Sequence, residues 1–164
     1  MKQLLIALFT FLTVAASAQD VGYTHKLLTP EGCRLKYSVV KQDSSYYIIA
    51  NIRSERFCFL NEPTMKIRTF NDEVITLKGM VIGSGSQSAG IISGNIIIPV
   101  TEISSTAQFP VTTDEFEMLN NGISKVRLSM TPTDHERTFK KDKIGKKLYE
   151  FYLKAQADDE NFYL

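Results

Sequence analysis

The segment Cys33–Ser54, with the sequence CRLKYSVVKQDSSYYIIANIRS, decides the fold. Apolar and polar residues alternate at its start and alternate again after the turn cluster Gln42–Ser45. Alternation with a period of two is typical of a strand that buries one face. With the turn at this cluster, Val39 pairs with Ile48 and the apolar faces of the two strands coincide. The segment therefore predicts an antiparallel hairpin.

The same alternation continues further along the chain. Met65–Thr69 and Ile75–Lys78 flank the turn residues Asn71–Glu73. We expect a second antiparallel hairpin there, in which Ile67 pairs with Leu77. Further extended segments are predicted at Ile91–Val100, Phe109–Val111 and Lys125–Met130.

Three polar stretches are expected to be irregular, namely Asp20–Gly32, Gly83–Gly90 (GSGSQSAG) and Thr131–Thr138. The glycine and serine content of Gly83–Gly90 favours a flexible hairpin connection. A phosphate-binding loop at Gly83–Ser86 is the other interpretation of this stretch. It is disfavoured because the Gly-Lys-Ser/Thr ending and a following amphipathic helix are missing.

Two helices are predicted. Thr112 and Glu115 have the spacing of a capping box at the start of a short helix, and Gly122 is placed to end it. Apolar residues recur at helical spacing across Lys141–Gln156, which indicates an amphipathic helix. Gly145 weakens that helix by about 1 kcal/mol relative to alanine, unless close packing requires a missing side chain.

These elements predict a mainly β chain with some helix, a β-rich α+β domain. We expect an antiparallel sandwich or curved sheet of about six or seven strands, with one short helix and a C-terminal helix packed on it. The expected organisation is a leader at 1–18, a tail or loop at 19–32, a single domain at 33–156 and a tail at 157–164.

The first residues have the features of a secretory signal peptide. Lys2 precedes the apolar run Leu4–Val14, and Ala16–Ala18 supplies the small residues that signal peptidase requires. The product is therefore expected to be exported, to the periplasm or the cell surface, without a transmembrane anchor. Removing Lys2 leaves 18 of the 19 basic residues against 18 acidic ones, which disfavours a nucleic-acid partner.

Cys33 and Cys58 are the two cysteines of the chain. In an exported protein an even number of cysteines favours a disulfide, and two buried free thiols are the alternative. The sequence has no CxxC pair and no histidine-rich spacing, so no metal and no cofactor are expected.

Candidate catalytic residues are few. His25 and His135 are the two histidines, and Asp134-His135-Glu136 suggests a general base. A triad needs a nucleophile and an acid on either side of the imidazole in space, and no nucleophile motif accompanies this segment. We expect a solvated loop here and assign no catalytic residue. A hydrolase remains the alternative if the fold places either histidine in a pocket beside Ser, Cys or a carboxylate.

Candidate binding residues are weakly indicated. Tyr47 points outward, whereas Tyr37 and Tyr46 have the parity of the core. Lys143, Lys146 and Lys147 lie on the polar face of the last predicted helix. These residues indicate a glycan- or polyanion-binding module as a further alternative. The tripeptides Lys66-Ile67-Arg68 and Lys125-Val126-Arg127 resemble each other, which we interpret as coincidence because nothing around them repeats.

Several stretches together resemble small exported domains of unknown function from Bacteroidetes-type bacteria. They are the leader ending in Ser-Ala-Gln, KIRTFNDEVITLKG, FPVTTDEFEMLNNGISKVRLSM and KKDKIGKKLYEFYLK. The resemblance covers roughly residues 33–155 and implies the compartment and the kind of host. We therefore expect a non-enzymatic envelope or periplasmic module, with an envelope protein or a glycan as its partner.

Overall fold

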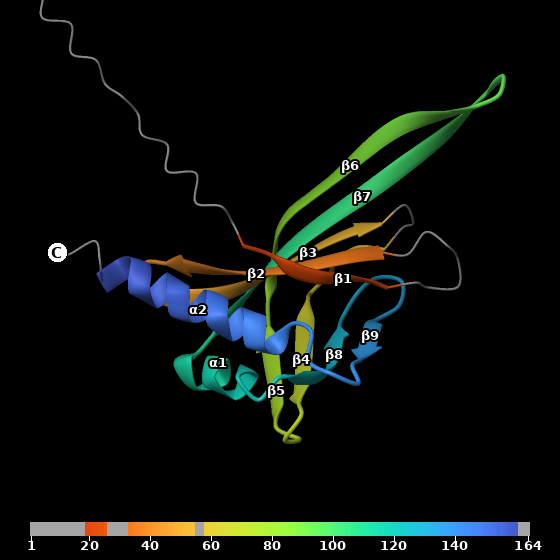
Figure 1. Cartoon of the computed structure of the whole chain (residues 1–164). Coiled ribbons are helices and arrows are strands. Elements are labelled where there is room, and N and C mark those ends of the chain that lie inside the picture. The colour runs from red at the N-terminus through yellow and green to blue at the C-terminus, as the bar shows by residue number, and fades with distance from the viewer. Residues whose placement is uncertain (1–18, 26–32, 55–57, 161–164) are drawn as a thin grey trace, which may run out of the picture.

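The structure is a computed structural model that describes residues 19–25, 33–54 and 58–160. Within these residues the strands form two antiparallel sheets, one of five strands and one of four (Figure 1). The five-stranded sheet contains, in spatial order, β1 (Val21–His25), β2 (Cys33–Gln42), β3 (Ser45–Ser54), β7 (Ile96–Val111) and β6 (Met80–Ser93). The four-stranded sheet contains β5 (Val74–Lys78), β4 (Thr64–Thr69), β8 (Ile123–Leu128) and β9 (His135–Thr138). The predicted mainly β, antiparallel class is confirmed.

The two predicted hairpins are both present. Val39 pairs with Ile48 as expected, and the inward side chains of β2 and β3 are buried apart from Val39 and Tyr46, which are half-buried. In the second hairpin Ile67 pairs with Ile75, and the predicted partner Leu77 lies opposite Met65 instead. The difference arises in the turn, which is tight and holds Asp72 at a φ of 64°. A shorter connection moves the partner strand by two residues and keeps the same face inward.

Three segments that we expected to be irregular form strands. Part of the predicted tail pairs with β2 as β1, and the end of Thr131–Thr138 pairs with β8 as β9. Gly83–Gly90 lies in the middle of β6, where it pairs with β7 along its whole length. The predicted strand Ile91–Val100 is divided by a reverse turn, in which Gly94 has a φ of 63°. Pairing with a neighbouring strand here outweighs the weak strand propensity of glycine and serine.

Both predicted helices form. In α1 (Thr113–Leu119), the Glu115 N–H donates to the Thr112 hydroxyl, and the Thr112 N–H donates to the Glu115 carboxylate. The capping box is therefore confirmed. The second helix, α2 (Gly145–Glu160), begins and ends later than predicted. It begins at Gly145 because Asp142 accepts hydrogen bonds from the N–H groups of Gly145 and Lys146, each at 2.9 Å.

The two helices cover the inner face of the five-stranded sheet beside the four-stranded sheet (Figure 1). The rings of Phe116 in α1 and Tyr152 in α2 stack with centroids 4.4 Å apart, and Tyr46 of β3 meets Tyr152 edge-on. A Cβ atom at Gly145 would lie 2.7 Å from the Ile123 nitrogen, so this glycine permits close packing of α2 on β8. Both sheets and both helices thus share one core.

The predicted leader, residues 1–18, lies outside the described residues. In the part of the chain that the structure does describe, neither helix combines the length and the apolar character that a bilayer span requires.

Candidate functional site

Four basic side chains gather on the outer face of the four-stranded sheet. Lys66 and Arg68 come from β4, and Lys125 and Arg127 come from β8. We call these four residues the cationic face. Strand register places Lys66 directly opposite Arg127, and Arg68 directly opposite Lys125. Like charges at directly opposed positions of a sheet destabilise it unless acidic neighbours or a ligand offset the repulsion.

The core beneath the sheet holds these side chains in place. Ile67 and Val126 alternate with the cations, pair with each other across β4 and β8, and are each 1% exposed. Because successive side chains of a strand point to opposite faces, burying these two residues forces the flanking cations outward. The apolar core therefore determines the position of the cationic face.

The acidic residues of the adjacent β9 region neutralise half of the cationic face. Lys125 lies 2.7 Å from Glu136, and Arg127 lies 2.9 Å from Asp134. The hydrogen bond from Lys125, together with the charges of Lys125 and Arg127, holds the pKa of the Glu136 carboxyl below its ordinary value. Lys66 and Arg68, by contrast, have no acidic partner within the residues that the structure describes.

The surface between these cations is hollowed in two places. A shallow hollow of about 280 Å³ is lined by Thr64, Lys66, Arg127, Ser129 and Asp134. A second, of about 180 Å³, lies around Arg68, Lys125 and the exposed Val74, and the carboxylate of Glu136 lines it as well. Opposed Cβ atoms in a sheet are about 5 Å apart and alternate residues about 7 Å apart, so the four cations form a compact rectangle. Such a rectangle can contact two or more anionic groups of one ligand.

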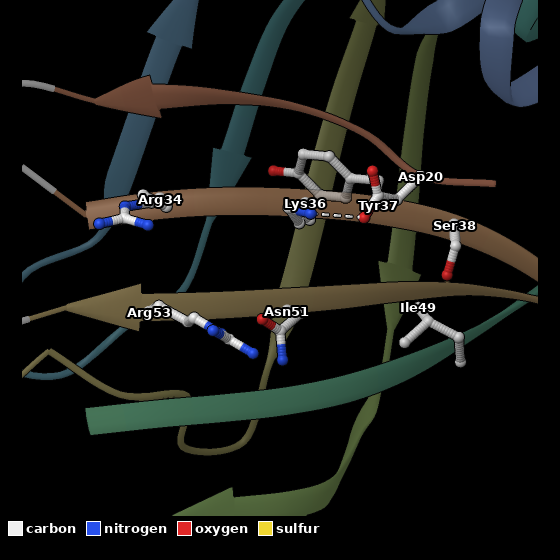
Figure 2. Close-up of a pocket in the computed structure, with 8 residues that line it drawn as sticks. All are labelled: Asp20, Arg34, Lys36, Tyr37, Ser38, Ile49, Asn51 and Arg53. Atoms are coloured by element: carbon white, nitrogen blue, oxygen red, sulfur yellow. Dashed lines mark hydrogen bonds and ion pairs between the residues drawn. The ribbon is translucent and has the colours of Figure 1, made fainter. Parts of the chain in front are cut away.

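A second cationic hollow lies on the outer face of the five-stranded sheet, and Figure 2 shows its lining. Its volume is about 360 Å³, and it is lined by Asp20, Arg34, Lys36, Tyr37, Ser38, Ile49, Asn51 and Arg53. Arg34 and Arg53 are opposed across β2 and β3. Lys36 lies 2.7 Å from Asp20, and Arg53 lies 3.8 Å from Glu102. This hollow is larger and is lined by three basic residues, of which Lys36 and Arg53 have acidic partners.

The structure does not bring the predicted binding residues together. Tyr47 is half-buried on the outer side of β3, and it is not one of the described residues that line the hollow in Figure 2. Lys143, Lys146 and Lys147 are exposed around the start of α2, which packs on the opposite, inner side of that sheet. None of these four residues belongs to the cationic face.

The predicted disulfide between Cys33 and Cys58 is wrong for this structure, in which both thiols are buried and free. Pairing of β2 with β3 ends at Arg34 and Arg53, and Ser54, the last residue of β3, pairs with Ile103 of β7. Cys58 is therefore not held in register opposite Cys33, and a disulfide requires a narrow range of Cβ separations and torsions. Burial, and next the neighbouring Cys58, raise the pKa of the Cys33 thiol.

His135 is not on a solvated loop, as we expected, but is a buried residue of β9. Its Nε2 lies 2.9 Å from the Tyr23 hydroxyl, which in turn lies 3.1 Å from the Tyr37 hydroxyl. Asp134 and Glu136, its neighbours in sequence, contact cations on the outer face instead. The side chain of His25 lies outside the described part of the structure.

The buried groups around His135 are poorly activated for nucleophilic chemistry. Burial raises the pKa of Tyr23 to about 12, and burial raises the pKa of Tyr37 well above its ordinary value. The pKa of the nearby Cys33 thiol is raised as well. A nucleophile for catalysis needs a lowered pKa or an adjacent base that takes its proton. The Tyr23 hydroxyl does lie beside such a base, His135, but neither residue lines any of the hollows described above. The arrangement instead links β1 and β2 to β9 across the core.

Comparison with known protein families, with functionally described proteins and with solved structures finds no match to this chain. The cationic face is therefore argued from its own geometry. Its sequence signal was the pair of similar tripeptides, Lys66-Ile67-Arg68 and Lys125-Val126-Arg127, which we interpreted as coincidence. The pairing of β4 with β8 shows that these tripeptides are direct neighbours.

Proposed function

We propose that this protein is an exported, non-enzymatic binding module that holds a polyanion on its cationic face. The expected ligand is an envelope glycan that carries repeated carboxylate, sulfate or phosphate groups. The observation that carries the proposal is the two pairs of opposed cations, Lys66 with Arg127 and Arg68 with Lys125. In each pair the β4 residue, Lys66 or Arg68, has no acidic partner among the described residues.

The energetics support a ligand of opposite charge. Like charges directly opposed on a sheet are destabilising; the ion pairs of Lys125 with Glu136 and of Arg127 with Asp134 relieve part of that cost, and the buried pair Ile67 and Val126 offsets the rest. A ligand with several anionic groups would convert the repulsion into attraction. Because the face is exposed, salt would screen this attraction and weaken binding.

The remaining parts of the proposal come from the sequence. Export is proposed from the leader at residues 1–18 and from the resemblance to small exported bacterial domains. The hydrolase alternative is less well supported, because burial raises the pKa values of the hydroxyl and thiol groups near His135.

Retention on immobilised heparin, followed by elution with salt, tests the proposal. The double variant Lys66→Gln/Arg68→Gln should bind about tenfold more weakly than the parent protein, a loss of about 1.4 kcal/mol. The matched control is Arg34→Gln/Arg53→Gln, which removes the same charge from the opposed pair on the other sheet.

The control variant should elute close to the parent protein. Equal losses in the two double variants would mean that net charge alone governs retention, and an unchanged Lys66→Gln/Arg68→Gln variant would remove the cationic face from the proposal. Titration of the parent protein with inorganic phosphate should show binding far weaker than to heparin, since one small anion meets only part of the rectangle.

A further inference from the structure

The hairpin of β6 and β7 projects away from the rest of the molecule (Figure 1). β6 forms the edge of the five-stranded sheet, and within the described residues β7 is its sole partner strand. The pairing of β7 with β3 ends at Ile103, so the outer part of the hairpin is a two-stranded ribbon. Within the part of the chain that the structure describes, the outer edge of β6 therefore presents unpaired backbone N–H and C=O groups over much of its length.

This edge lacks most of the devices that usually prevent strands from pairing with other chains. Residues 80–111 contain one charged side chain, Glu102, and it lies on β7. β6 itself has neither charge nor proline, and its register irregularity is confined to Val81–Gly83 at its base. Soluble proteins normally protect an edge with charges, prolines or bulges along the strand. A long neutral edge indicates that another strand pairs with it.

Apolar side chains occur at both ends of β6 and are exposed there. At the base Met80, Val81 and Ile82 are 58%, 41% and 50% exposed, and at the tip Ile92 is 76% exposed. Between them Gly83–Gly90 contains small residues and one glutamine. A two-fold axis near Gln87 would place the apolar tip of one strand beside the apolar base of an identical antiparallel strand. The edge is therefore complementary to itself.

We propose that a second copy of this chain pairs with β6 edge to edge and antiparallel, which makes a symmetric dimer. The two hairpins then form a four-stranded ribbon in the order β7, β6, β6, β7. Backbone groups along both edges gain partners, and Ile92 of each copy packs against the Met80–Ile82 segment of the other. In a symmetric dimer a residue near the two-fold axis faces its own copy, so a charge there would meet a like charge. A neutral strand avoids this repulsion.

Other occupants fit this edge less well. A bilayer would cover the apolar tip, but it offers no partners for backbone groups, and each unsatisfied group costs several kcal/mol in hydrocarbon. The hairpin also lacks basic residues that would attract anionic lipid. A protein groove that receives the tip alone would leave Met80 and Val81 exposed at the other end of the strand.

The test is sedimentation velocity of the full chain, expressed with its own leader, over a range of concentrations. The parent protein should sediment as a dimer. Gln87→Lys and Gln87→Glu each place two like charges near the axis, so each should weaken dimerisation at least tenfold. An equimolar mixture of the two variants should restore dimers, because opposite charges then face each other; this recovery also requires that both variants are folded.

Thr101→Lys is the matched control, because it adds a charge to the exposed part of β7 and leaves the β6 edge neutral. It should dimerise as the parent does. If the parent protein is monomeric at all concentrations, the proposal is overturned. This conclusion holds even if the monomer binds phosphatidylcholine vesicles in a flotation assay. Equal weakening by Thr101→Lys and Gln87→Lys, or no recovery in the mixture, would overturn it as well.

Discussion

The cationic face and the β6–β7 hairpin are both exposed, and the main difference between them is their charge. On the cationic face four basic residues crowd onto two short neighbouring strands. The hairpin, across residues 80–111, has a single charged residue. An ordinary protein surface mixes charges of both signs. The cationic face has an excess of positive charge, whereas the hairpin has almost no charge. The first surface therefore suits a ligand of opposite charge, and the second suits a neutral strand like itself.

The two surfaces also differ in how they are held. The cationic face lies directly over the core, and each of its strands places buried side chains beneath it. No described element packs behind the outer hairpin, and its exposed isoleucines contribute little to the fold of one chain. Substitutions should therefore affect folding strongly beneath the cationic face and weakly at the hairpin tip.

The largest expected effect is a difference in stability between two isoleucine-to-alanine variants, one beneath the cationic face and one near the hairpin tip. Ile67 is 1% exposed beneath the cationic face, and Ile97 is 70% exposed near the hairpin tip. Ile67→Ala should lower the free energy of unfolding by about 2–5 kcal/mol, because it leaves a cavity in the core. Ile97→Ala should change it by less than about 0.5 kcal/mol. Urea denaturation at low protein concentration measures both, and similar losses would show that the tip is packed within one chain.

An intermediate effect is expected at Asp142, which accepts a hydrogen bond from the N–H of Ile123 at the start of β8. It also caps α2 through Gly145 and Lys146. Asp142→Ala should therefore cost about 1–2 kcal/mol, as the loss of a capping residue does. Amide hydrogen exchange should accelerate at Ile123 and remain unchanged in the outer hairpin.

The pH dependence of this contribution follows from the pKa of Asp142. Burial alone would raise the pKa, but the backbone N–H groups of Ile123, Lys146, Gly145 and Ile144 together hold it below its ordinary value of 3.8. The stabilisation is thus complete above the pKa of the unfolded chain and is lost as pH falls through the lower folded pKa. The parent protein should lose this increment in acid, and Asp142→Ala should not. Asp114→Ala, in the exposed first turn of α1, serves as the control: it keeps Asp142 and should lose the increment in acid as the parent does, and absence of that loss in this variant too would argue against the assignment.

Local signals predict much of the body. The register of β2 with β3 follows from one turn and one alternating pattern, and the capping box of α1 from residues three apart. The sequence shows the two similar tripeptides of the cationic face but not that they are neighbours. β4 and β8 are distant in the chain, and no local pattern predicts that they pair. The strand β6 is missed for a different reason, since its glycines and serines have low strand propensity and become extended only through pairing with β7.

The smallest expected effect comes from a substitution that raises stability and weakens binding. Lys66→Glu replaces the repulsion between Lys66 and the opposed Arg127 with attraction. It should raise the free energy of unfolding by about 0.2–1 kcal/mol, and high salt should reduce the gain. Retention on heparin should fall, because the cationic face loses a charge and gains an opposing one.

Lys78→Glu is the control, since Lys78 shares this outer face but lies opposite the neutral Thr64. It makes the same change in net charge and should bring no gain in stability. A Lys66→Glu variant that is both less stable and less well retained would mean that the opposed cations do not repel each other. The contrast with the neutral hairpin would then no longer indicate a ligand, because a surface without stored repulsion is explained by folding alone.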